Sequence, residues 1–280
     1  MLLGVHVSIS GHIYESINRA RALRCNTMQI FSRDPRQWRK LRLKPADIEE
    51  FRKRREKSNI SLVFIHIPYL INLASPYNIL YNGSIRACIE DIREAETLGA
   101  EYIVTHMGSH KKSGEVPGIK KITQALNKIL DRTAKSSVSL LLENTSGSGS
   151  WLGYKFEHQR LIIDGIEDKK RIGVCFDTCH AYVAGYNLAS AEGYNATIAE
   201  LDELVGLKKL RLIHLNDTRD KLASHRDRHE HIGKGRIGLE GFRRLVSDPR
   251  LKDVAFILET PKDSDDADRI NLQTVRKLKK

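Results

Sequence analysis

Short apolar runs alternate with amphipathic segments along the whole chain. Eight runs are rich in Val, Ile, Leu and Phe, at 2–8, 27–32, 61–68, 102–108, 139–145, 171–178, 210–217 and 254–260. Continuous apolar runs of this length are typical of parallel strands that are covered on both faces. We therefore expect eight strands that lie inside the molecule.

The segments between these runs carry apolar residues at helical spacing. Ile and Leu recur every three or four residues in 84–99 and again in 119–130. A helix is expected to begin at Pro45, because proline suits the first helical turn, and another over 189–205. Strict alternation of strand and helix predicts an α/β fold, a single (β/α)8 TIM barrel domain over residues 1–280. An open doubly wound sheet is the alternative.

The longest segment without a periodic pattern is 217–238, after the seventh apolar run. It is polar and rich in charge, so we expect a functional loop at the mouth of the barrel. The first run is followed by GVHVSISGH and not by a Gly-rich phosphate-binding motif, which weighs against the doubly wound alternative.

Side chains that can bind metals stand at or just after the ends of six predicted strands. They are His66, His106, Glu143, Asp177, His180, His214, Asp227, His229 and Glu259. One such histidine is usually a hydrogen-bonded structural residue. In a barrel, however, the C-terminal strand ends converge on one face, where active sites are built. Four carboxylates brought together there need cations, and imidazole with carboxylate is a ligand set for divalent metals.

The charge of this set favours three metal ions over two. Two divalent ions would only neutralise four carboxylates, whereas three leave positive charge for an anionic substrate. Nine side chains also provide three or four ligands for each of three ions if one carboxylate bridges. The sequence therefore favours a trinuclear phosphodiesterase.

The remaining histidines divide into two groups. His6 and His110 are candidates to support the ligands from behind. The others are expected on the surface or in loops: His12, His158, His225 and His231.

The composition is that of a basic globular protein. The 280 residues carry a formal net charge of +12, and 40% of them are hydrophobic, which is enough for a large core. Such a charge fits a polyanionic partner such as nucleic acid, or it only keeps the protein soluble. The basic run 52–55 is interpreted mainly as a solvated helix face.

Several sequence features predict a cytoplasmic protein. No apolar run is long enough for a transmembrane helix, and the first residues lack the pattern of a signal peptide. The four cysteines form no CxxC pair, which indicates reduced thiols.

Nine segments along nearly the whole chain match the motifs of one known family in order. They are GVHVSISG (4–11), FSRDPRQW (31–38), HIPYLINLAS (66–75), THMGSH (105–110), ENTSGSGSWLG (143–153), GVCFDTCHAYVAGYN (173–187), HLNDTRD (214–220), DRHEHIGKG (227–235) and ILET (257–260). With these segments the chain resembles the endonuclease IV family of apurinic/apyrimidinic endonucleases.

The resemblance implies a DNA repair endonuclease that hydrolyses the phosphodiester bond 5′ to an abasic site in duplex DNA. The products would be a 3′-hydroxyl and a 5′-deoxyribose phosphate, with accessory phosphodiesterase or phosphatase activity on blocked 3′ ends. It implies three Zn²⁺ ions, with Mn²⁺ as an alternative. No organic cofactor or membrane partner is expected, and a monomer suits an enzyme that clamps a bent duplex.

The resemblance also assigns roles by position. His66 and His106 would hold the first metal, and Glu143 would bridge it to a second. The second metal would also bind Asp177, His214 and Glu259, and the third would bind His180, Asp227 and His229. Glu143 and Glu259 are the candidate catalytic residues.

Three further positions match DNA-contacting residues of the family. Arg36 and Tyr69 would enter the duplex at the lesion, with Gln37 beside the arginine. The chain departs from the usual family pattern at Met107, Lys234 and His12, where Pro, Glu and Gly are common. None of these departures removes a predicted ligand.

Two other functions compete with this interpretation. A sugar isomerase on a similar barrel would use two metals, held by Glu143, Asp177, His214 and Glu259. It would leave the set at 180, 227 and 229 without a role, and it has no need of the basic charge. An inert nucleic-acid-binding protein on this scaffold would not need every ligand retained.

Overall fold

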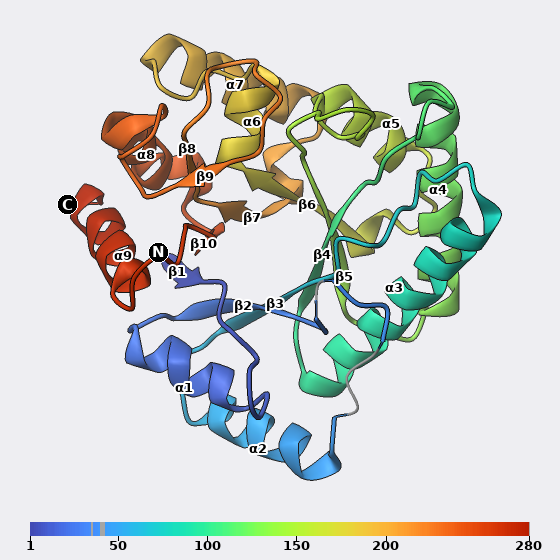
Figure 1. The fold of residues 1–280 in the computed structure, drawn as a ribbon, viewed down its shortest axis with the longest axis horizontal. Helices are drawn as coiled ribbons and strands as arrows, with labels where there is room; N and C mark the ends of the chain where they lie inside the picture. Colours follow the sequence, from blue (N-terminus) through green and yellow to red (C-terminus); the bar gives the residue numbers. More distant parts are fainter. Residues whose placement is uncertain (35, 40–42, 280) are drawn as a thin grey trace.

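The computed structural model describes residues 1–34, 36–39 and 43–279, and its centre is a barrel of eight parallel strands with helices around it (Figure 1). The strands are β1 (Leu2–Val5), β2 (Thr27–Phe31), β3 (Leu62–His66), β4 (Tyr102–His106), β5 (Ser139–Glu143), β6 (Ile172–Asp177), β7 (Leu210–His214) and β10 (Ala255–Leu258). All eight predicted runs form strands, so the TIM barrel is confirmed and the doubly wound alternative is wrong.

The strands follow one another around the barrel in hydrogen-bonded order β1-β10-β7-β6-β5-β4-β3-β2. Between β2 and β1 the barrel is closed by a parallel bridge of His6 with Gln29, where the N–H of Val7 donates to the Gln29 carbonyl at 2.8 Å. Gly4 permits this close approach, because a Cβ there would lie 1.9 Å from the carbonyl oxygen of Thr27.

The helices cover the outside of the barrel (Figure 1). They are α1 (Glu15–Ala22), α2 (Pro45–Glu56), α3 (Asn78–Leu98), α4 (Glu115–Arg132), α5 (Phe156–Asp164), α6 (Thr178–Ala184), α7 (Ala191–Leu204), α8 (Gly238–Ser247) and α9 (Ala267–Leu278). The four predicted helices are confirmed, although α3 and α4 begin earlier than expected. In the described ranges, no helix is long and apolar enough to cross a membrane.

The segment 217–238 is more ordered than the sequence predicts. It contains two short antiparallel strands, β8 (Asp217–Thr218) and β9 (His229–Glu230). The expected loop is present between β7 and α8, with this short strand pair inside it. Two-residue strands carry no periodic pattern that a sequence could display.

A small apolar cluster made of strand residues alone fills the barrel interior. It contains Phe64, Val104, Leu141, Cys175, Leu212, Ala255 and Ile257. Because side chains alternate between the two faces of a strand, the residue two positions further along also points inward. Six such residues continue this interior toward the C-terminal strand ends: His66, His106, Glu143, Asp177, His214 and Glu259. The strand period thus places predicted ligands directly above the apolar core.

Barrel closure provides a stability test. Gly4→Ala should lower the free energy of unfolding by about 1–3 kcal/mol, because the added methyl group must displace the Thr27 backbone. The matched control is Gly83→Ala within α3, where the nearest atom would be the Arg86 guanidinium at 4.0 Å. The control should stabilise by up to about 1 kcal/mol through helix propensity. Urea denaturation measures both, and equal midpoints would refute the role of Gly4.

Candidate metal centre

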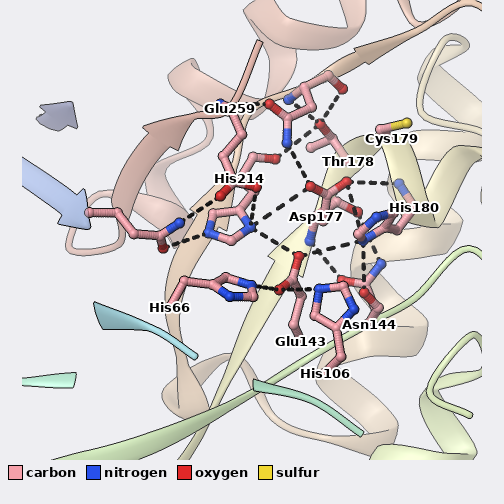
Figure 2. Close-up of polar contacts among 12 residues, drawn as sticks. His66, His106, Glu143, Asn144, Asp177, Thr178, Cys179, His180, His214 and Glu259 are labelled. Atoms are coloured by element: carbon pink, nitrogen blue, oxygen red, sulfur yellow. Dashed lines mark hydrogen bonds and ion pairs between the residues drawn. The ribbon is translucent and has the colours of Figure 1, made fainter. Parts of the chain in front are cut away.

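Glu143 is the centre of the polar layer above the barrel core (Figure 2). Its carboxylate is completely buried. Oε2 lies 3.0 Å from Nε2 of His66 and 3.1 Å from Nε2 of His106. Oε1 lies 3.0 Å from Nδ1 of His214 and 3.5 Å from Nδ1 of His180. The strand register contributes directly, since His106 and Glu143 are opposite each other on β4 and β5.

Asp177 and Glu259 extend this arrangement on the far side of His214. Nδ1 of His214 is 3.3 Å from Oε2 of Glu259 and 3.8 Å from Oδ2 of Asp177. Asp177 is opposite His214 in the β6–β7 register. It is also the N-cap of α6, where its Oδ1 accepts a hydrogen bond of 2.8 Å from the backbone N–H of His180. One residue therefore ends a strand, caps a helix and faces the polar layer.

Asp227 joins the two remaining histidines. Its Oδ2 lies 3.0 Å from Nε2 of His180, and its Oδ1 lies 3.2 Å from Nε2 of His229. Nε2 of His229 is also 3.9 Å from Oδ2 of Asp177, so this group adjoins the others.

The nine predicted ligands come together in three adjoining groups. The groups are His66, His106 and Glu143; Glu143, Asp177, His214 and Glu259; and His180, Asp227 and His229. Within each group, one possible ligand atom from every residue lies within 4.8 Å of the others, so each group could hold a metal ion. Glu143 belongs to two of them, as a bridging carboxylate would.

Two cysteines also lie near these groups. Cys175 and Cys179 are buried within ligand distance of them. Burial raises the pKa of the Cys179 thiol to about 12. Histidines and carboxylates alone make up the three groups described above.

Four of the histidine rings are oriented in a way that fits divalent metals. In each of the four, one ring nitrogen lies 3.0–3.2 Å from a carboxylate oxygen, and the other lies within hydrogen-bond distance of an outer oxygen. The outer contacts are His66 Nδ1 to the Ile67 carbonyl (2.7 Å), His180 Nδ1 to the Asn144 carbonyl (3.0 Å), His214 Nε2 to Gln29 Oε1 (2.9 Å) and His229 Nδ1 to the Glu259 carbonyl (3.0 Å). Because these oxygens only accept, each outer nitrogen donates, and the inner nitrogen of a neutral ring keeps its lone pair for a metal.

His229 provides a further indication of a metal site. Its inner nitrogen, Nε2, is buried and has no hydrogen-bond partner among the described residues, although Asp227 lies close to it. A buried polar atom without a partner costs free energy, which a metal–ligand bond would remove.

Carboxylates and imidazoles that face each other in this layer shift each other's pKa values. Burial alone would raise the pKa of Glu143, but the facing His106 and His214 outweigh burial and hold that pKa well below its ordinary value. Burial would lower the pKa of His214 and His229, yet the nearby carboxylates raise both to about 9. Positive charge is therefore strongly favoured in this layer, whether protons or metal ions carry it.

Buried amides that the sequence analysis missed hold the ligands from behind. Gln29 donates from Nε2 to Oε1 of Glu259 at 2.6 Å and accepts from Nε2 of His214 at 2.9 Å. Asn216 donates to Oδ2 of Asp177 at 2.6 Å and accepts from the N–H of Glu259 at 2.8 Å. Glutamine and asparagine are weak signals in a search for metal ligands. Gln29, however, is opposite the inward-facing Phe64 in the β2–β3 register and could have been found by the strand period.

The other histidines follow the predictions in part. His6 does lie behind the ligands, with Nδ1 3.1 Å from Oε1 of Glu259. His110 instead accepts from the N–H of Gly114 in the loop before α4. His158 is buried on α5, so its placement on the surface or in a loop was wrong. Its Nδ1 accepts from the N–H of Gly153 at 3.1 Å, which fixes the end of the loop after β5.

The predicted DNA-contacting residues lie on exposed parts of the chain. Tyr69 is half exposed, and its ring centroid is 5.7 Å from that of His66 and 5.9 Å from that of His106. Arg36 and Gln37 are exposed in the loop after β2. Asp34 holds this loop, accepting from the Arg36 N–H and from Nε2 of Gln37, both at 2.9 Å.

The three departures from the family pattern lie outside the ligand groups. Met107 is buried against Gly153, where a Cβ would lie 2.3 Å from its Cε. Lys234 and His12 are exposed.

The basic run 52–55 is partly neutralised. Arg54 pairs with Glu15 and Glu50, while Arg55 pairs with Glu101 just before β4, at the barrel end opposite the polar layer. Its interpretation as a helix face is therefore supported.

The double contact of Gln29 predicts an effect on metal binding. Gln29→Leu removes the group that orients both His214 and Glu259, so metal affinity should fall by about 10–100-fold. Gln159→Leu is the matched control, because Gln159 is equally buried but donates only to the Leu142 carbonyl. Chelator competition measures both affinities. Equal affinities in the two variants would contradict the orienting role of Gln29.

The chain is similar to known proteins over nearly its whole length. The family model described as Xylose isomerase-like TIM barrel matches residues 17–280. A protein named probable endonuclease 4 from Methanoculleus marisnigri is 43% identical over 278 residues, which is 99% of each chain. One of the same name from Chloroflexus aurantiacus is 42% identical over 276 residues, covering 98% of this chain and 97% of the relative.

Solved structures divide into a close relative and more distant barrels. The crystal structure of endonuclease IV from Thermus thermophilus has a TM-score of 0.89 and 37% identity, covering 99% of this chain and 98% of that one. A D-tagatose 3-epimerase-like protein has a TM-score of 0.76 at 20% identity over 99% and 96% of the two chains, which shows a shared fold only. This chain belongs to the endonuclease IV family and is an enzyme of the nuclease class.

Proposed function

We propose that this protein is a DNA repair endonuclease that hydrolyses the phosphodiester bond 5′ to an abasic site in duplex DNA. The products are a 3′-hydroxyl and a 5′-deoxyribose phosphate, and blocked 3′ ends are accessory substrates. The observation that carries the proposal is the group of His180, Asp227 and His229, which adjoins the other six ligands in one polar layer. The relatives' name, endonuclease 4, supports a nucleic-acid substrate.

Three divalent ions would be held by the three ligand groups. Imidazole and carboxylate donors suit Zn²⁺, and Mn²⁺ is the alternative. When bound, such ions act as Lewis acids that lower the pKa of water and stabilise charge on phosphate oxygens. Glu143 connects two groups because it belongs to both, and Glu259 is held within its group by contacts with His214 and Gln29.

Tyr69 can act at the rim of the site as a hydrogen-bond donor. Although half of this residue is exposed, its partial burial and the carboxylates of Glu259 and Glu143 raise the pKa of its phenol above the ordinary value. The phenol therefore stays protonated near neutral pH and can donate a hydrogen bond to a phosphate oxygen.

Recognition of the lesion depends on the shape of the DNA. An abasic nucleotide has no base to stack, so its extrusion costs less than that of a normal nucleotide. Arg36 and Tyr69 would fill the gap and hold the duplex bent, with Gln37 beside them. The net charge of +12 favours association with the DNA backbone. We propose that the single domain of residues 1–280 acts as a monomer in the cytoplasm, without an organic cofactor.

Sugar isomerisation is the second candidate, because barrels with epimerase names share the fold. Four ligands would suffice for it, in the group of Glu143, Asp177, His214 and Glu259. That reaction gives no role to His180, Asp227 and His229. The third group therefore favours phosphodiester hydrolysis.

An incision assay tests the proposal. A duplex with one abasic-site analogue should be cut once, 5′ to the lesion, while an undamaged duplex stays intact. Chelator should abolish cutting and added Zn²⁺ should restore it. Glu259→Gln should reduce incision by at least about 100-fold, because it changes a ligand and not only an outer partner. Gln159→Leu serves as the folded control.

Two results would contradict the proposal. One is an abasic duplex that stays intact under conditions in which the protein is folded and metal-loaded. The other is incision that persists in full after chelation or in Glu259→Gln.

A further inference from the structure

Asp217 is a buried carboxylate that binds backbone N–H groups and not a cation. It lies on β8 with no exposed surface. Oδ1 accepts from the N–H groups of Thr218 (2.8 Å) and Ile237 (2.9 Å). Oδ2 accepts from those of Gly233 (3.0 Å), Gly235 (3.0 Å) and Gly238 (3.3 Å). No ion pair with Asp217 is found in the described part of the chain.

The turn 233–238 is shaped around this carboxylate. Backbone N–H groups that converge on an anion form a nest, which compensates negative charge without a side chain. Gly233 and Gly238 have φ values of +77° and +72°, which favour glycine. A Cβ at Gly235 would lie 2.5 Å from Oδ1 of Asp217 and 2.3 Å from the Thr218 carbonyl. The glycines of this turn thus allow the backbone to enclose the carboxylate.

The same contacts connect the turn to the third ligand group. β8 pairs with β9, with Thr218 opposite His229, and the N–H of Arg236 donates to the Thr218 carbonyl at 2.8 Å. β8 therefore lies between the turn and His229 of β9 and connects the two. Asp227, two residues earlier, faces both His180 and His229.

We propose that Asp217 is a positioning residue for the third ligand group: its carboxylate fastens the segment 229–238 so that His229 and Asp227 face His180. The inference rests on the proposed function, in which this group holds one of three ions. Asp217 touches neither metal nor substrate. Its effect passes through the backbone of the turn and β9.

Two substitutions break this anchor in different ways. Asp217→Asn keeps the shape of the side chain but replaces one carboxylate oxygen by an NH2 group. This group cannot accept hydrogen bonds, so the backbone N–H groups that faced that oxygen lose their acceptor. Gly235→Ala keeps the carboxylate and forces the turn away from it. Gly83→Ala is the matched control, a glycine substitution in α3 with open space around it.

The test combines ion counting with proteolysis of each full-length variant. Proteins are stripped of metal, reloaded with Zn²⁺ and digested with trypsin, which has several Lys and Arg sites in 219–236. Asp217→Asn and Gly235→Ala should each bind one ion fewer than the wild type. They should be cut in 219–236 at least about tenfold faster, because local opening exposes the segment. Gly83→Ala should match the wild type.

A folded variant that keeps the wild-type ion count would overturn the inference even if trypsin cuts it faster, because the loss of a merely stabilising contact speeds proteolysis without removing an ion. If neither variant folds, hydrogen exchange of the wild type decides. The N–H groups of Gly233, Gly235 and Ile237 should then be strongly protected, and free exchange would overturn the anchor. A wild type that binds fewer than three ions would contradict the proposed function, while proteolysis and exchange would still test Asp217.

Discussion

The carboxylate of Glu143 has no exposed surface and is surrounded by the imidazoles of four histidines. An isolated buried charge would be very costly, so this carboxylate requires positive charge around it. Protons on the imidazoles can provide that charge, as the raised pKa values of His180 and His214 indicate. Divalent ions provide it with better geometry, because they bind several donors at once. Gln29 and Asn216 hold the ligands in place around this charge, through hydrogen bonds from outside the layer.

The barrel is what makes such a concentration of charge possible. Its interior is apolar through the middle layer and becomes polar only where the strands end. Because side chains alternate along a strand, six strands each place one inward-facing ligand in the polar layer at the strand ends. Ligands that are distant in sequence therefore meet without a long loop. Loops then complete the layer from outside, through α6 with His180 and through the β8–β9 segment with His229. The rigid strands carry the central ligands, and the third group depends on a segment that must be fastened separately.

Much of this arrangement could be predicted from sequence because it follows simple periods. Strand ends followed by His, Asp or Glu identified the ligands at 66, 106, 143, 177, 214 and 259, and the barrel brought them together. The residues that escaped prediction depend on partners that a sequence does not display. Gln29 orients ligands through an amide, which is not a ligand type, and Asp217 binds backbone N–H groups that every residue has. His158 was misplaced because burial of one helix face depends on the neighbouring loop, here at Gly153.

Anomalous diffraction from crystals grown with Zn²⁺ tests most directly whether the polar layer is a trinuclear metal centre. Maps recorded above and below the zinc absorption edge should show three peaks per chain. One is expected against His66, His106 and Glu143, one against Asp177, His214 and Glu259, and one against His180, Asp227 and His229. A single peak, or peaks away from these side chains, would contradict the central claim.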